Sequence, residues 1–114
     1  MGKAMSYQSE KFSVARSCLL LPHPRGEETS IADAMFNIDL GLDGYQVPDD
    51  FNEDAAGQLA ELRRMMVRDG LEDPEDVGLY TVLARTWDVD ERHRFSHLVD
   101  ELAWWFSEYD RPHA

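Results

Sequence analysis

The sequence predicts an all-α fold, a single-domain bundle of four to five helices. Apolar residues recur at steps of three and four along most of the chain, which is the spacing of one face of an α-helix. Prolines, glycines and acidic capping residues separate the segments that have this spacing. The chain has 114 residues and a hydrophobic content of 43%, so it can bury one modest core.

We place the folded domain at residues 6–110. Residues 1–5 are expected to be a disordered N-terminus or a cloning remnant, and residues 111–114 a short tail. No internal repeat or low-complexity linker divides the remainder.

The first helix is predicted from Ser6 to Leu21. Phe12, Ala15 and Leu19 fall on one stripe, and Pro22 ends the segment. Residues 12–21 are also compatible with a strand, so the helix is the preferred of two interpretations.

The second helix is predicted to start after Thr29 or Ser30, because either hydroxyl can cap it. Glycines 41 and 44 are expected to close it. Its stripe consists of Ile31, Ala34, Met35, Ile38 and Leu42.

The third helix is predicted to be capped by Asp49 or Asp50 and to end at Gly70. Its apolar face consists of Phe51, Ala55, Leu59, Leu62, Met65 and Met66. A short fourth helix is expected to begin at Asp73 and Pro74, since proline suits a first helical turn.

The last helix is predicted from Asp88 to about Tyr109. Glu91 follows Asp88 by three residues, which is the spacing of a capping box. Its stripe consists of Phe95, Leu98, Val99, Leu102, Phe106 and Tyr109. We expect the third and last helices to form the central antiparallel pair.

The charge is unevenly distributed. The net charge is −12, and residues 26–62 hold ten acids and no Lys or Arg. Such a chain should repel nucleic acid and anionic membranes, so we expect no direct contact with either. A macromolecular partner is expected to be a basic protein.

No motif of an enzyme is present. The sequence lacks a nucleophile elbow, a phosphate-binding glycine loop and a dinucleotide fingerprint, and its acids fall on polar faces or loops. We therefore expect no catalysis and no cofactor. The preferred hypothesis is a non-catalytic protein resembling an immunity protein, an antitoxin or a nucleic-acid mimic in character. Its docking surface would include Asp39, Asp43, Glu53, Asp54 and Glu61; the alternative is a solvated acidic face.

Trp104 is predicted to face away from the core. On a helical wheel it lies about 180° from Phe95, between His93 at about 160° and His97 at about 200°. Exposed tryptophan is common at binding hot spots, so Trp104 and His97 are candidates for a partner contact or a homodimer interface. Alternatively, another segment covers Trp104, or an irregular helix end displaces it from the predicted face.

His93 and His97 have the four-residue spacing that lets two imidazoles share a metal, and Glu101 is a further candidate ligand. Because both histidines are predicted to point outward, solvent exposure is the preferred interpretation.

The remaining sequence features indicate the compartment. The single cysteine, Cys18, excludes an intramolecular disulfide and is expected to be a small buried side chain. No apolar run reaches the roughly 20 residues needed to span a bilayer, and no signal peptide is evident. We therefore expect a cytoplasmic protein.

Overall fold

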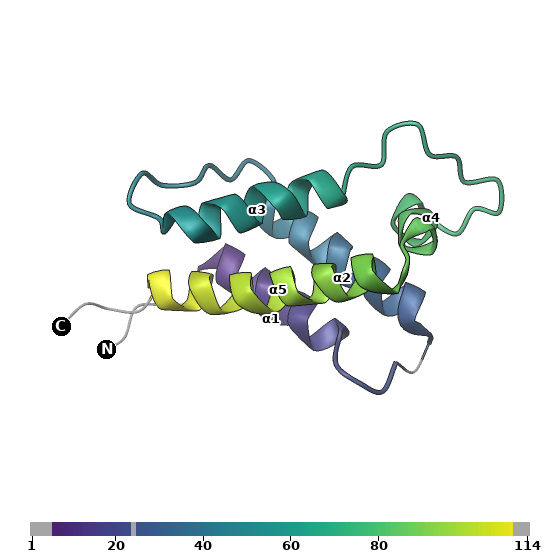
Figure 1. Ribbon diagram of the computed structural model, residues 1–114, viewed down its shortest axis with the longest axis horizontal. Coiled ribbons are helices and arrows are strands. Elements are labelled where there is room, and N and C mark those ends of the chain that lie inside the picture. Colours follow the sequence, from purple (N-terminus) through teal and green to yellow (C-terminus); the bar gives the residue numbers. More distant parts are fainter. Residues whose placement is uncertain (1–5, 24, 111–114) are drawn as a thin grey trace.

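A computed structural model describes residues 6–23 and 25–110; the expectations for residues 1–5 and 111–114 lie outside these ranges. The described residues form five helices and no strand, which confirms the all-α bundle. The helices are α1 (Tyr7–Cys18), α2 (Glu27–Leu42), α3 (Glu53–Met65), α4 (Leu79–Thr86) and α5 (Val89–Asp110) (Figure 1).

The N-terminal helices form a hairpin. Ser6 caps α1, its hydroxyl accepting from the backbone N–H of Ser9 at 3.1 Å. Residues 12–18 belong to this helix, so the alternative of a strand over residues 12–21 is wrong. The helix ends at Cys18, before the predicted Leu21, and Cys18 is only half-buried. The contact between α1 and α2 is the most extensive in the fold.

Helix α2 differs from its prediction at both ends. It begins at Glu27 after Gly26, with no side-chain cap, so Thr29 and Ser30 lie inside its first turn rather than before it. At the other end, Gly41 is buried within the helix, where α2 crosses α1. Gly44 follows the helix with a φ of 71°, a conformation that suits glycine.

Helix α3 begins later and ends earlier than predicted. Asn52, not Asp49 or Asp50, is the cap, and its side-chain oxygen accepts from the Ala55 N–H at 3.1 Å. The helix ends at Met65, so Gly70 lies in the following loop. The prediction took Gly70 as the glycine that closes the helix, but Met66 is the C-cap, and Gly70, with a φ of 79°, forms part of the following loop.

Asp73 does not start α4. Its carboxylate accepts from the N–H groups of Val77 and Gly78 at 2.8 and 2.7 Å, and these bonds hold residues 73–78 as a loop. Helix α4 therefore begins at Leu79. The Asp73 carboxylate accepts hydrogen bonds from nearby backbone N–H groups, as a helix cap would, but these bonds close a turn instead of starting a helix.

Helix α5 follows its prediction closely. The Asp88 N–H donates to Glu91 Oε1 at 3.2 Å and the Glu91 N–H donates to Asp88 Oδ1 at 2.8 Å, which is a complete capping box. Helices α3 and α5 pack antiparallel, as expected (Figure 1). They are not the sole central pair, because α1 packs against both α2 and α5.

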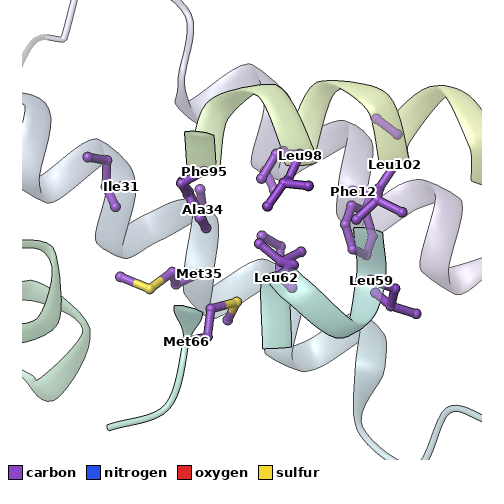
Figure 2. Close-up of a cluster of buried hydrophobic side chains, with 14 of the residues drawn as sticks. Phe12, Ile31, Ala34, Met35, Leu59, Leu62, Met66, Phe95, Leu98 and Leu102 are labelled. Carbon is purple, nitrogen blue, oxygen red and sulfur yellow. The ribbon is translucent and has the colours of Figure 1, made fainter. Parts of the chain in front are cut away.

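One apolar core joins all five helices, and Leu83 and Ala84 are the contribution of α4. Figure 2 shows Phe12 from α1, Met35 from α2, Leu62 from α3 and Leu98 from α5 converging on it. Phe12 is fully buried, and its ring centroid lies 4.9 Å from that of Phe106. Burial of these side chains is the main force that assembles the bundle.

The two ends of the described chain meet. The backbone N–H of Ser6 donates to Asp110 Oδ2 at 3.0 Å, which ties the start of α1 to the end of α5. Within the described ranges, no helix combines the length and apolar character that crossing a membrane requires.

Candidate functional site

Two of the predicted docking residues are neutralised within the fold. Asp39 on α2 pairs with Arg68 at 2.9 Å, and Glu61 on α3 receives two bonds of 2.6 Å from Arg94 on α5. Hydrogen bonding to Arg94 lowers the pKa of Glu61 below its ordinary value. Exposed pairs of this kind contribute little to the stability of a fold, because solvent screens them. Their larger effect here is to cancel acidic charge on the surface.

The acids at the start of α2 are also paired. Glu27 binds Arg92 at 2.9 Å and Glu28 binds Arg85 at 2.9 Å. Asp33 binds Arg25 at 2.8 Å. The uniform acidity of residues 26–62 is therefore a property of the sequence, because arginines from other parts of the chain interrupt it in space.

Several unpaired acids gather between the end of α2 and the first turn of α3. We call residues 43–54, which include the first two residues of α3, the acidic loop; the segment contains five acids and no base. Asp50 accepts from the Tyr109 hydroxyl at 2.8 Å, and this bond raises the pKa of Tyr109. The other four acids are exposed and have no ion pair or side-chain hydrogen bond with any described residue. They are Asp43, Asp49, Glu53 and Asp54.

The acidic loop is firmly anchored. Phe51 is 6% exposed, and its ring lies 5.3 Å from Phe106 and 5.4 Å from Tyr109 between centroids. Asn52 then caps α3, which places Glu53 and Asp54 in the first turn of that helix. The carboxylates of Glu53 and Asp54 therefore follow directly after residues that are held in place by packing and capping.

Trp104 and the histidines lie on the outer face of α5, as the helical wheel indicated. Trp104 is 54% exposed and makes a T-shaped contact with Trp105 at 4.8 Å between ring centroids. It borders a pocket of about 350 Å³ with residues of α1 and α5, including Arg16 and Asp100. No described segment covers it, so the expectation of a covering segment is wrong for the described chain.

The metal hypothesis gains no support. His93 and His97 are both exposed, and His97 Nε2 lies 3.4 Å from Glu101 Oε1. Over residues 6–23 and 25–110, no three His, Cys, Asp or Glu side chains lie close enough to hold an ion together.

A groove between α2 and α4 was not predicted from the sequence. It has a volume of about 920 Å³, and residues 66–69 after α3 form one of its walls. Four exposed apolar side chains line it: Phe36, Leu40, Val67 and Leu79. The sequence could have indicated that two of them are exposed, because Phe36 and Leu40 lie about 140° and 180° from Ile31 on the α2 wheel. That position is opposite the core stripe.

A polar cluster of three residues occupies one wall of this groove. Asp39 accepts from both Arg68 and the Tyr80 hydroxyl, and the Arg68 guanidinium lies 4.3 Å from the centroid of the Tyr80 ring. Burial, the hydrogen bond to Asp39 and the charge of Asp39 together raise the pKa of Tyr80 to about 12. Such a tyrosine stays neutral at physiological pH, so this cluster favours a structural role over acid–base chemistry.

Comparison of this chain with models of protein families, with curated proteins and with solved structures found no match to any of them.

Proposed function

We propose that this chain is a small non-catalytic binding protein that docks a basic protein partner through the acidic loop. An immunity protein, an antitoxin and a mimic of nucleic acid would each share this character. The observation that carries the proposal is the set of four unpaired carboxylates on an anchored loop.

The distribution of arginines supports the proposal. Six arginines form ion pairs with acids of the same chain: Arg16, Arg25, Arg68, Arg85, Arg92 and Arg94. Six of the eleven basic residues are thus engaged within the fold, and the net charge is −12. A field of this sign accelerates encounter with a basic protein, and salt screens it.

The anchoring of the loop supports it as well. Phe51 and Asn52 fix the segment before a partner arrives, so little ordering entropy is lost on binding. The competing explanation is that Glu53 and Asp54 only favour the positive N-terminal end of α3. That explanation does not extend to Asp43 and Asp49.

The test compares two variants with equal charge changes. One neutralises the acidic loop through Asp43→Asn, Asp49→Asn, Glu53→Gln and Asp54→Asn. The control neutralises four exposed acids elsewhere, through Glu10→Gln, Glu72→Gln, Asp76→Asn and Asp90→Asn.

Each protein is immobilised and exposed to native lysate at low and high salt, and retained proteins are identified by mass spectrometry. We expect wild type and control to retain the same basic proteins at low salt, and the loop variant to lose them. Equal retention by the loop variant would overturn the proposal.

A second candidate function is a homodimeric accessory protein with Trp104 at its interface. The exposure of this large side chain on the outer face of α5 favours it. Sedimentation equilibrium should then give a dimer mass that Trp104→Ala reduces to that of a monomer without loss of helicity. A monomeric wild type would eliminate this candidate.

A further inference from the structure

The groove between α2 and α4 exposes more apolar surface than folding requires. Phe36 is 52% exposed and Val67 is 55% exposed, with Leu40 and Leu79 beside them on the lining. Isolated exposed apolar residues are ordinary, but a group of them gathered on one concave surface is typical of an interaction site.

The groove is preformed. Asp39 holds both Arg68 and Tyr80, and the Arg68 guanidinium packs over the Tyr80 ring. Phe36 meets the same ring edge-on, with centroids 6.4 Å apart. These contacts link α2, α4 and residues 66–69, the three segments that carry the four apolar side chains.

The charges around the groove indicate what occupies it. Asp39 and Arg68 cancel each other, which leaves two carboxylates, Asp43 and Asp69, and one cation, Arg63, so the lining keeps a small excess of negative charge. Arg63 donates to the backbone carbonyl of Tyr45 at 3.4 Å. The two carboxylates have no ion pair with a described residue. Asp43 is also the first residue of the acidic loop, so the groove and the loop form one continuous surface.

We infer that the groove receives an amphipathic helix of the basic partner. Its apolar face would cover Phe36, Leu40, Val67 and Leu79, and its flanking Lys or Arg residues would face Asp43 and Asp69. Helices bind grooves in this way through apolar residues repeated at three- and four-residue steps. A second copy of this chain fits less well, because each copy carries a net charge of −12. The inference rests on the proposed function and names the part of the partner that is bound.

The experiment uses defined probes with the full chain. One probe is a fluorescent helical peptide of about 18 leucine and lysine residues, or about five turns. The other has glutamate in place of lysine. Binding is measured by fluorescence anisotropy to wild type, to Phe36→Ser/Val67→Ser, and to the control Leu20→Ser/Val89→Ser. The control removes two apolar side chains that are somewhat more exposed than Phe36 and Val67 and that lie outside the groove lining.

We expect the lysine peptide to bind wild type and the control within about twofold, and the groove variant at least about tenfold more weakly. The glutamate peptide should not bind saturably. Circular dichroism checks that the variants are folded, which is expected because all four substituted side chains are exposed. Equal binding of the lysine peptide to the groove and control variants would overturn the inference.

Two further outcomes separate this inference from the proposed function. If a partner captured through the acidic loop binds the groove variant as tightly as wild type, the inference fails while the proposed function stands. If sedimentation shows that wild type is a dimer and the groove variant a monomer, the occupant is a second copy and the inference is wrong. If neither the loop variant nor the groove variant retains the partner that wild type captures, the result supports both the proposed function and this inference.

Discussion

The close packing of α1 against Gly41 of α2 predicts opposite effects for alanine substitution at Gly41 and at Gly57. A Cβ added at Gly41 would lie 2.9 Å from Lys11 Cβ and 3.4 Å from Lys11 Cγ. Lys11 Cβ is fixed to the backbone of α1, so it cannot move aside as a side-chain tip could. A Cβ added at Gly57 in α3 would meet nothing within 4 Å.

The magnitudes follow from two opposing terms. Replacing a helical glycine by alanine stabilises by about 0.5–1 kcal/mol at either site. Overpacking at Gly41 costs about 1–3 kcal/mol, because α1 must shift away from α2. Gly57→Ala should therefore raise the free energy of unfolding by up to about 1 kcal/mol. Gly41→Ala should lower it by up to about 2.5 kcal/mol.

Urea unfolding followed by circular dichroism at 222 nm measures both variants. The helix-propensity term cancels in their difference, which isolates the steric cost of about 1–3 kcal/mol. The m-values should match wild type, since the surface exposed on unfolding hardly changes. If Gly41→Ala stabilises the protein as much as Gly57→Ala does, the close packing of α1 on α2 is refuted.

Three further predictions concern the core, the groove and a helix end. Phe12→Ala should destabilise by about 3–5 kcal/mol, measured by thermal unfolding, because the ring is fully buried, and Phe12→Leu should cost clearly less. The pKa of Tyr80 is raised to about 12, so the folded state favours its protonated form. This contribution is complete below the unfolded pKa of about 10 and is lost as pH rises to about 12. Tyr80→Phe should flatten the decline in stability over that interval, and an unchanged slope would contradict the assignment. Asp88→Ala should cost about 1 kcal/mol through the α5 capping box, and Asp88→Ser should restore most of it; equal losses in the two variants would argue against the cap.

The sequence predicted those parts of the fold that depend on neighbouring residues. The Asp88 capping box and the outward position of Trp104 each follow from a few residues of one helix. The prediction was wrong where the same residues could form either of two local structures. Asp73 could cap a helix or close a loop, and only the loop lets α4 begin at Leu79.

The candidate site was less predictable than the fold. The partners of Glu27 and Glu28 lie 65 and 57 residues away, so the sequence could not show which acids are neutralised. The groove was missed because it depends on α4 lying beside α2. Of the predicted docking acids, Asp39 and Glu61 are paired, and Asp43, Glu53 and Asp54 remain candidates.

The hydrogen bond between Ser6 and Asp110 determines where a tag or a fused domain would sit relative to the acidic loop. The neighbouring Tyr109 binds Asp50, so both ends of the described chain lie beside the acidic loop. A tag or fused domain that extends from either end would leave the bundle next to that loop. A circular permutant that joins residues 6 and 110 through a short linker and opens the chain at the exposed Glu72 would move the attachment point onto the loop before α4. The acidic loop would then be presented without an adjacent tether.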